Sequence, residues 1–407
     1  MTASSKDSED TTSAGVSRRG LLSGSLGAAL GLGAGALLGH QFTAQTHVPD
    51  ASASLSPNPK PSDSVGTTVT IPAFGDHQAG IVLPATPQGH GNLVSLTFPE
   101  LPAKPDLKAL LRVIGEEIAA LSAGKRLEVL PDGPQGLTLT VGLGPRLMRL
   151  FGDGVPGTED LPAFNGDEHL GADNGGDLLL AAYSHDAGLF TPVALALRAL
   201  LPTHSLTWEQ RVFRGPSQGT VVRNPFGFHD GVIVPRGSEE EDKNIWISDT
   251  QAPGFGRGTV FVLRQLHLLT TDFLAQDIPA QEQVFGRKKI TGAPLSGGDL
   301  MDEVNLKLKS AQGDFLTPLN SHARAAHPSF TGSKLMFRRS YSYDNGPADS
   351  GLAFMSFQSD LRTFYATQHR LDEVDALMPF TRPRRSCTFF ILPGFQADAP
   401  LGSTLPD

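Results

Sequence analysis

Short stretches in which hydrophobic and polar residues alternate make up much of the chain from Thr67 onward, and proline and glycine separate them. Alternation at every second position is typical of a β-strand with one buried face. The pattern therefore predicts strands over residues 68–74, 92–98, 137–144, 177–184, 258–268 and 351–360.

Other stretches repeat apolar residues at steps of three and four, the spacing of one face of an α-helix. The clearest of them, behind a Pro105-Asp106 start, has its apolar residues at Leu107, Leu110, Leu111, Ile114, Ile118 and Leu121. A proline and an acidic residue in the first turn are typical of a helix N-terminus. The predicted helices cover residues 105–124, 191–201 and 361–380.

Strands and helices are mixed in the same way on both sides of residue 225. Such a pattern predicts an α+β fold built from two related sheet-and-helix domains. We expect the first to span residues 67–225 and the second residues 226–400.

The N-terminal region carries two signals that do not belong to a folded domain. Arg18 and Arg19 precede a glycine-rich, weakly apolar stretch, which is typical of a Tat export signal over residues 1–43. A membrane anchor, or retention of the uncleaved signal as one, is the alternative that the length of the stretch permits. Residues 44–66 are rich in Ser, Pro and Asp and are predicted to form a disordered linker.

Composition excludes several classes of function. The net charge of -9 argues against nucleic acid or an anionic membrane as the main partner, because those surfaces attract basic proteins. The chain has one cysteine, Cys387, so neither an internal disulfide nor a cysteine-based metal cluster is available. Any metal chemistry must use histidine or carboxylates, and a Tat substrate is suited to carry a cofactor inserted before export.

One segment, RNPFGFHDGVIVP at residues 223–235, holds a carboxylate in a run without helical or strand periodicity. Asp230 lies between Gly227 and Gly231, and glycine permits positive φ and a close backbone approach to a flat ligand. An Asp-Gly pair is also common in surface turns, so this segment alone leaves both interpretations open.

Two histidines lie close together in NSHARAAHPSF. On a helix, five residues turn a side chain by about 500°, so His322 and His327 would point in different directions and could not bind one ion together. His327 also precedes Pro328, which favours an extended backbone. We therefore expect at most one metal ligand here and favour His322, although an isolated histidine is more often not a ligand.

Strand geometry predicts the side-chain directions of two further pairs of residues. Arg338 and Arg339 end an apolar run, and on a strand one can point inward while the other meets solvent. The alternative is that both are surface charges. Leu352 and Phe354 share one face of the strand predicted at 351–360, where they either wall an apolar pocket or pack in the core.

Eight blocks in this order resemble the dye-decolourising peroxidases. They are AFGDHQAGIVLP, LTVGLGPRLMRLFG, GDLLLAAY, NPFGFHDG, QVFGRKKITGAPL, HARAAHP, MFRRSYSYDNG and GLAFMSFQSD, and together they extend over about residues 67–395. The resemblance implies two ferredoxin-like domains with antiparallel sheets, and one haem b held mainly by the C-terminal domain.

The resemblance also assigns roles to residues. His322 corresponds to the proximal iron ligand, Asp230 to the distal acid and base, and Arg338 to the distal arginine that stabilises negative charge during O–O cleavage. Peroxide would be reduced through a ferryl porphyrin radical that oxidises dyes, phenolics, porphyrins or metal ions. The remaining residues expected at the cofactor are Gly227, Gly231, Leu352, Phe354 and Arg287, the last facing a haem propionate.

The same resemblance points to an exported branch that includes deferrochelatase/peroxidases. It implies hydrogen peroxide and small reductants as partners, export by the Tat machinery and a homo-oligomer. An acidic pH optimum is also implied, and it suits an aspartate base, because an ordinary aspartate stays ionised down to about pH 4. Bulky donors would be oxidised at the surface, with Trp246, Tyr341, Tyr343 and Tyr183 as candidate relay residues.

Two positions depart from the pattern usual in that family. His229 stands where lysine is common before the aspartate, and Val232 stands where threonine is common after the glycine. His229 either perturbs the charge of Asp230, carries a second distal proton, or points away from the haem.

Three rival functions remain to be weighed. GPSQG at 215–219 matches the serine hydrolase elbow, but that motif needs a preceding strand and a following helix, and no helical pattern follows. A haem-trafficking or iron-release protein needs only the histidine and an apolar pocket, so the pairing of Asp230 with Arg338 favours peroxide chemistry. An electron-transfer partner of another exported protein is the third possibility.

Overall fold

The structure, a computed structural model, describes residues 69–168 and 174–407. The predicted export signal and linker, residues 1–66, lie outside this part of the chain. All described residues belong to one compact unit that covers Ser62–Asp407.

The N-terminal half of the unit has the strand–helix order of a ferredoxin-like fold. Its antiparallel strands lie in the order β2-β3-β1-β4. The elements are β1 (His90–Thr97), α1 (Lys104–Ser122), β2 (Thr138–Leu143), β3 (Leu178–Ser184), α3 (Phe190–Arg198) and β4 (Ser205–Phe213).

The C-terminal half repeats this arrangement, with strands in the order β11-β7-β10-β9 and β8 also paired to β10. Its main elements are β7 (Thr259–Leu268), β8 (Phe337–Arg338), β9 (Tyr341–Asp344), β10 (Ser350–Gln358), α9 (Arg362–Val374) and β11 (Thr381–Ile391). The chain is therefore α+β with antiparallel strands, as the sequence predicted. The boundary near residue 225 stays a prediction.

Shorter elements connect the two halves and surround the C-terminal one. They are α2 (Pro145–Met148), β5 (Val222–Arg223), β6 (His229–Asp230), α4 (Ser238–Asn244), α5 (Thr270–Leu274), α6 (Ile278–Phe285), α7 (His322–Ala325) and α8 (Pro328–Thr331), with 3-10 turns at Arg149–Phe151, Ala187–Leu189 and Met378–Phe380.

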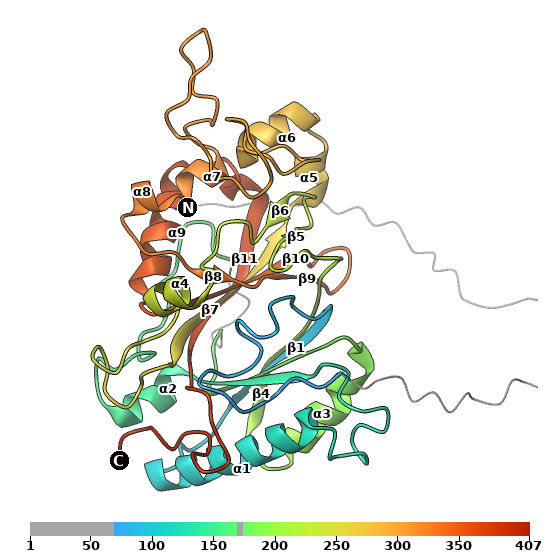
Figure 1. The fold of residues 1–407 in the computed structure, drawn as a ribbon, viewed down its shortest axis with the longest axis vertical. Helices are drawn as coiled ribbons and strands as arrows, with labels where there is room; N and C mark the ends of the chain where they lie inside the picture. Colours follow the sequence, from blue (N-terminus) through green and yellow to red (C-terminus); the bar gives the residue numbers. More distant parts are fainter. Residues whose placement is uncertain (1–68, 169–173) are drawn as a thin grey trace, which may run out of the picture. The chain divides into compact units, whose positions relative to one another are not determined.

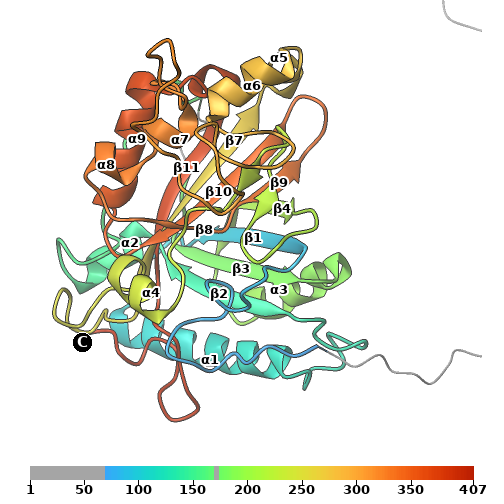
Figure 2. The same ribbon diagram turned by 45° about the horizontal axis from the view of Figure 1, so that its top comes forward.

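The two halves share one nine-stranded sheet. β11 pairs with β2 at Phe390↔Leu143, and β4 pairs with β9 at Phe213↔Ser342. An additional pairing of β7 with β10 joins strands from opposite parts of this order, so the sheet closes on itself. Figures 1 and 2 show α1 below the N-terminal strands and α3 to their right, whereas α7, α8 and α9 lie beside β11 at the other end.

Three apolar clusters stabilise this arrangement. The first packs the inner face of α1, including Leu107, Leu111 and Ile114, against the N-terminal strands. The second lies where the halves meet and joins Tyr183 of β3 to side chains of β7, β9 and β10. The third gathers Phe226, Phe228, Phe273, Phe285, Leu268 and Leu377 around one end of the C-terminal half.

Most predicted elements are present, and the differences have local causes. The described part of the predicted strand 68–74 is not a strand, and Pro72 within it lacks the N–H that a ladder needs. The predicted helix 361–380 ends at Val374, because Asp375 adopts an extended backbone (ψ 118°). Strands β4 and β11 were missed, since charged residues and Pro383 interrupt their apolar pattern.

Candidate active site

A largely apolar cavity lies between the sheet of the C-terminal half and its helices. Side chains of β7, β10 and β11 form one wall, and residues of α7 and α9 form the other. The apolar residues of the wall include Leu266, Leu268, Phe285, Leu352, Phe354 and Leu371. Such a cavity suits a flat, mostly apolar ligand.

His322 enters this cavity from the first turn of α7. Its Nδ1 lies 2.6 Å from Oδ2 of Asp375, and the histidine side chain keeps 37% of its exposure while Asp375 keeps 1%. The other carboxylate oxygen accepts the backbone N–H of Leu377 at 2.9 Å, which fixes the orientation of Asp375. The carboxylate therefore holds the proton on Nδ1 and leaves Nε2 available as a ligand.

The same pair sets the basicity of the ring. Burial by itself lowers the pKa of His322, but the Asp375 carboxylate and its hydrogen bond outweigh burial and raise that pKa above the usual histidine value. A more basic imidazole is a stronger electron donor to a metal. Asp375 was not among the residues singled out from the sequence, because it was expected inside a continuous helix.

His327 lies outside α7 and caps α8, accepting the N–H of Ser329 at its own Nδ1 (3.1 Å). Its backbone is extended (ψ 134°), as expected before Pro328. The two histidines therefore do not form a chelating pair.

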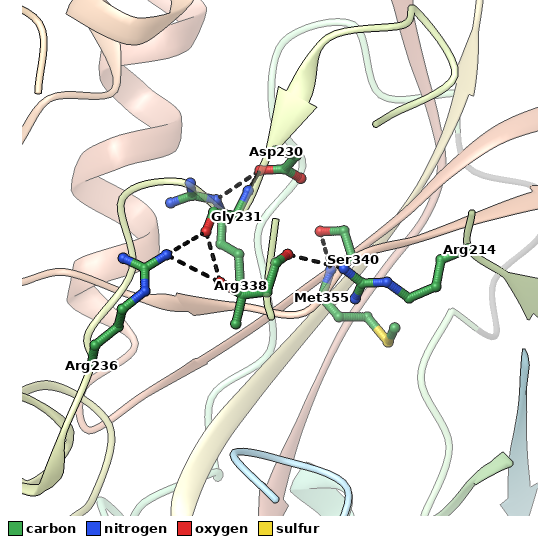
Figure 3. A network of polar contacts seen from close by, with 8 residues as sticks. Arg214, Asp230, Gly231, Arg236, Arg338, Ser340 and Met355 are labelled. Atoms are coloured by element: carbon green, nitrogen blue, oxygen red, sulfur yellow. Dashed lines mark hydrogen bonds and ion pairs between the residues drawn. The ribbon is translucent and has the colours of Figure 1, made fainter. Parts of the chain in front are cut away.

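Asp230 faces the cavity from a two-stranded ribbon in which it pairs with Val222 of β5. Its Oδ1 accepts the N–H of Gly231 at 2.6 Å and Nε of Arg338 at 3.4 Å. Among the described residues, Oδ2 has no hydrogen-bond partner (Figure 3). The surface-turn interpretation therefore does not hold for this carboxylate.

The glycines on either side of Asp230 both adopt positive φ, +86° at Gly227 and +74° at Gly231. A Cβ at Gly231 would come within 2.3 Å of the carbonyl oxygen of Thr220, so this position requires glycine. Gly227 is not among the residues that line the cavity, and a Cβ there would contact Lys289 at 3.0 Å.

The two arginines of the Arg338-Arg339 pair have different environments. Arg338, at the end of β8, lines the cavity beside Asp230. The expectation that its neighbour meets solvent was wrong, because Arg339 is only 2% exposed. It donates to the carbonyl oxygens of Ile81 (2.7 Å) and Pro84 (3.2 Å) and to Oε1 of Gln88 (2.8 Å). These acceptors take the Nη1 and Nη2 donors of a buried guanidinium and tie the C-terminal half to the N-terminal half, whereas its Nε has no partner among the described residues.

Leu352 and Phe354 both line the cavity from β10, as their two-residue spacing predicted. β10 pairs with β7, so that Leu352 lies opposite Leu266 and Phe354 lies opposite Arg264. All four residues line the cavity, so this stretch of sheet forms its wall.

Arg287 and His229 also line the cavity. Arg287 donates from Nη1 to the carbonyl oxygens of Gly292 (2.9 Å) and Leu300 (3.0 Å) and from Nη2 to that of Asp302 (2.7 Å), so it holds a loop in place as well. The Nδ1 atom of His229 is buried without a partner, and burial lowers the pKa of this histidine. This nitrogen lies beside Gly292, where a Cβ would approach it to 2.5 Å, and the role of His229 toward Asp230 stays a prediction.

Arg264 is a cavity residue that the sequence did not single out. Its Nη2 donates to Oδ1 of Asp167 at 2.5 Å, and both side chains are almost fully buried. Its Nε and Nη1 are buried without hydrogen-bond partners. The apolar pattern of β7 predicts a buried strand. It does not predict that Arg264 is paired with a carboxylate far away in the sequence.

The four candidate relay residues, Trp246, Tyr341, Tyr343 and Tyr183, are at most 5% exposed. None of them can contact a donor at the surface, so each can act only inside the protein. The GPSQG segment follows β4 but is followed by β5 rather than a helix, which leaves no hydrolase elbow.

No group of three or more His, Cys, Asp or Glu side chains within 69–168 and 174–407 could hold a bare metal ion. No helix in this same part of the chain has the length and apolar character needed to cross a membrane.

Comparison with known proteins identifies close matches over nearly the whole described unit. Residues 78–214 match the model of the Dyp-type peroxidase N-terminal domain, and residues 222–396 match that of the C-terminal domain. The chain is 31% identical to a dye-decolorizing peroxidase of Thermobifida fusca over 94% of this chain and 95% of that protein. It is also 31% identical to a deferrochelatase of Yersinia pestis bv. Antiqua, over 81% and 82% of the two chains.

Solved structures give the same result. A DyP-type peroxidase from Streptomyces coelicolor superposes with a TM-score of 0.76 at 29% identity, covering 85% of this chain and 99% of the other. Ferric DtpA from Streptomyces lividans gives the same TM-score, identity and coverage.

Proposed function

We propose that His322, Asp230 and Arg338 carry the chemistry of this chain, which belongs to the Dyp-type peroxidase family and is a haem peroxidase. Like other members of that family, it reduces hydrogen peroxide and oxidises reductants. The observation that supports the assignment best is geometric: one cavity brings together an oriented imidazole, a carboxylate with a free oxygen and an arginine.

The cavity fits a haem b. One histidine suffices for an iron that a porphyrin already holds, and the apolar walls suit the macrocycle. The unpartnered N–H groups of Arg264 and the unpartnered ring nitrogen of His229 are suited to polar groups at the porphyrin edge. Arg287, which lines the cavity on the side of His229, is proposed to face a propionate. When bound, the haem supplies the iron that takes up peroxide and stores its oxidising equivalents.

Asp230 is proposed as the acid and base for hydrogen peroxide. Its Oδ1 is held by Gly231 and Arg338, so Oδ2 is the oxygen that can take the first proton of peroxide. The same oxygen then returns the proton to the oxygen atom that leaves as water. A fixed carboxylate with one free oxygen meets the geometric requirement for both transfers.

Arg338 is proposed to stabilise the negative charge that develops as the O–O bond breaks. Its side chain lines the cavity from the end of β8, and a guanidinium presents several N–H donors in a fixed planar geometry. A fixed cation in a cavity with little water acts more strongly than the same cation in solvent. Leu352 and Phe354 exclude bulky molecules from this space, which leaves room for peroxide.

The test is rapid mixing of the haem-loaded protein with one equivalent of hydrogen peroxide, followed by absorbance. A fast change of the Soret band, reversed when a reductant is added, supports the proposal. Slow bleaching of the haem would contradict it and would favour a haem carrier.

Iron release from haem is the second candidate function, because several relatives carry the name deferrochelatase. The two functions differ in their products. Free porphyrin that accumulates with ferrous iron under reducing conditions, without peroxide, would support release. The pairing of Asp230 with Arg338 favours peroxide reduction, since iron release alone does not require it.

For donors too large for the cavity, Tyr343 is proposed as the internal relay. Oxidation of a tyrosine releases its phenolic proton, so an effective relay needs a base beside the hydroxyl. The hydroxyl of Tyr343 donates to Oδ1 of Asp349 at 3.0 Å. Those of Tyr183 and Tyr341 donate instead to Sδ of Met355 and to a carbonyl oxygen, both of which are poor proton acceptors.

Tyr343 also lies near the cavity wall. It pairs with Gly351, the residue before Leu352 in β10. We expect Tyr343→Phe to remove the tyrosyl radical that forms after peroxide and to slow oxidation of a bulky dye, while the reaction with peroxide is unchanged. Electron paramagnetic resonance and dye kinetics measure the two effects. Tyr341→Phe is the matched control, and an equal loss in both variants would rule Tyr343 out as a specific relay.

Export by the Tat machinery is proposed from Arg18 and Arg19 in residues 1–43, with residues 44–66 as a tether to the folded body. Export would place the enzyme outside the cytoplasm. Replacing both arginines with lysine is expected to retain the protein in the cytoplasm, because Tat receptors read the arginine pair. Cell fractionation with immunodetection measures this, and unchanged export of the variant would contradict the assignment. A homo-oligomer, and domains over 67–225 and 226–400, are further parts of the proposal.

A further inference from the structure

We propose that Thr220 and Arg236 are positioning residues that hold Asp230 in place through the carbonyl oxygen of Gly231. This inference rests on the function proposed above for Asp230. It concerns how the carboxylate keeps its position rather than which group reacts.

The carbonyl oxygen of Gly231 accepts two hydrogen bonds. Oγ1 of Thr220 donates to it at 2.9 Å, and Nη2 of Arg236 donates to it at the same distance. Nη2 of Arg236 also donates to Oγ1 of Thr220 at 3.2 Å, so the three groups form a closed triangle. Figure 3 shows Arg236 reaching Gly231 from the side opposite Arg214.

Thr220 is itself held from two sides. Its carbonyl oxygen accepts Nη2 of Arg214 at 3.0 Å, and Arg214 is only 8% exposed. The guanidinium of Arg214 lies over the ring of Tyr341, 5.1 Å from its centre. The same carbonyl oxygen of Thr220 would lie 2.3 Å from a Cβ at Gly231, so the two backbones are in close contact. Thr220 is therefore a fixed point against which Gly231 is held.

Asp230 needs this support because its own ladder is short. β5 and β6 pair over two residues, and the chain leaves the ladder at Gly231. Glycine at positive φ resists rotation less than other residues do. Val232, the next residue, has no side-chain donor, so Thr220 and Arg236 supply the restraint that follows Asp230. The N–H of Gly231 binds Oδ1 of Asp230, which means that fixing this residue also fixes the carboxylate.

The decisive comparison is Thr220→Val against Thr220→Ser. Valine keeps the shape of threonine without the hydroxyl, whereas serine keeps the hydroxyl. We expect Thr220→Val to lower kcat/KM for hydrogen peroxide about tenfold, since small displacements of a catalytic group cost up to about 100-fold. Thr220→Ser should keep most of the rate, and KM for a small reductant should not change in either variant.

Arg236 provides an independent test, because it is exposed and its replacement should not affect folding. We expect Arg236→Met to slow the peroxide reaction and Arg236→Lys to restore part of it, since lysine can still donate to the Gly231 carbonyl. Thr207→Val is the matched control. Thr207 shares a 2.6 Å hydrogen bond with Thr97 in the N-terminal sheet, away from Asp230.

A second readout does not depend on turnover. Hydrogen–deuterium exchange of the 225–235 segment, measured with and without haem, should be faster in Thr220→Val and Arg236→Met but not in Thr220→Ser. The inference would be overturned if Thr220→Val and Arg236→Met both kept the wild-type rate with peroxide and the wild-type hydrogen exchange. So would a Thr220→Ser variant as slow as Thr220→Val, because packing alone would then explain the effect.

Asp230→Asn, measured in parallel, distinguishes failure of the role proposed for Asp230 from failure of the positioning role proposed for Thr220 and Arg236. If Asp230→Asn reacts with peroxide as fast as wild type, the function proposed for Asp230 fails. If Asp230→Asn is slow while Thr220→Val and Arg236→Met are not, the positioning inference alone fails.

Discussion

Arg338→Ala is expected to slow the first reaction with hydrogen peroxide by about 10²- to 10³-fold, the usual cost of removing one preorganised donor from a developing anion. Arg338 lines the cavity and its Nε lies 3.4 Å from Oδ1 of Asp230, so its loss removes the cation and one restraint on the carboxylate. Stopped-flow absorbance at increasing peroxide concentrations gives the rate constant.

Asp230→Asn tests the other half of this pair. Asparagine has the same shape but cannot accept the peroxide proton, so we expect the rate constant with peroxide to fall about 10²- to 10⁴-fold, the range for general acid–base catalysis.

The control for Arg338→Ala is Arg112→Ala, which removes an arginine from the exposed face of α1. A wild-type rate constant in Arg338→Ala would remove this residue from the mechanism.

His322→Ala should lose the haem. The imidazole is the ligand proposed for the iron, and apolar contacts with the macrocycle would be the main interactions left. We expect the haem affinity to fall by more than about 100-fold, because loss of the ligand itself exceeds the effect of altering its hydrogen-bond partner. Asp375→Asn should keep more haem, with a fall of about tenfold, because the ligand remains but loses its carboxylate partner.

Haem titration followed at the Soret band measures both variants. The reduction potential adds a readout specific to Asp375, since a less basic imidazole should raise it. His204→Ala is the control, because this partly exposed histidine contacts the carbonyl oxygen of Pro202 in the N-terminal half. Full haem affinity in His322→Ala would mean that another group binds the iron.

The elements with strong periodicity were predictable from local pattern. In α1, Leu107, Leu111, Ile114 and Ile118 recur at helical spacing and are buried, and the alternation in β10 correctly put Leu352 and Phe354 on one face. Where other interactions outweigh local preference, the pattern was insufficient. β11 contains Pro383 and three arginines, yet it pairs along β7, with a bulge between Pro383 and Arg385 and a hydrogen bond from Arg385 to Gln265.

The candidate site shows the same division. The Gly-x-x-Asp-Gly segment and the positions of His322 and Arg338 could be read from the chain, because each depends on residues that are near in sequence or on the resemblance to a family. The partner of His322 could not, since Asp375 lies 53 residues away. Strand alternation also failed to predict the burial of Arg339, because its acceptors lie 251 to 258 residues away, in the N-terminal half.

By itself, the sequence determined the alternation of strands and helices, the need for glycine beside Asp230 and the family to which the chain belongs. Only the tertiary structure decided which groups are held and which are free. It put Asp375 on His322, used one oxygen of Asp230 and left the other open, and brought Thr220 and Arg236 to the Gly231 carbonyl. The reason is physical: backbone preference acts over a few residues, whereas the hydrogen bonds that orient these groups form only after distant strands have paired.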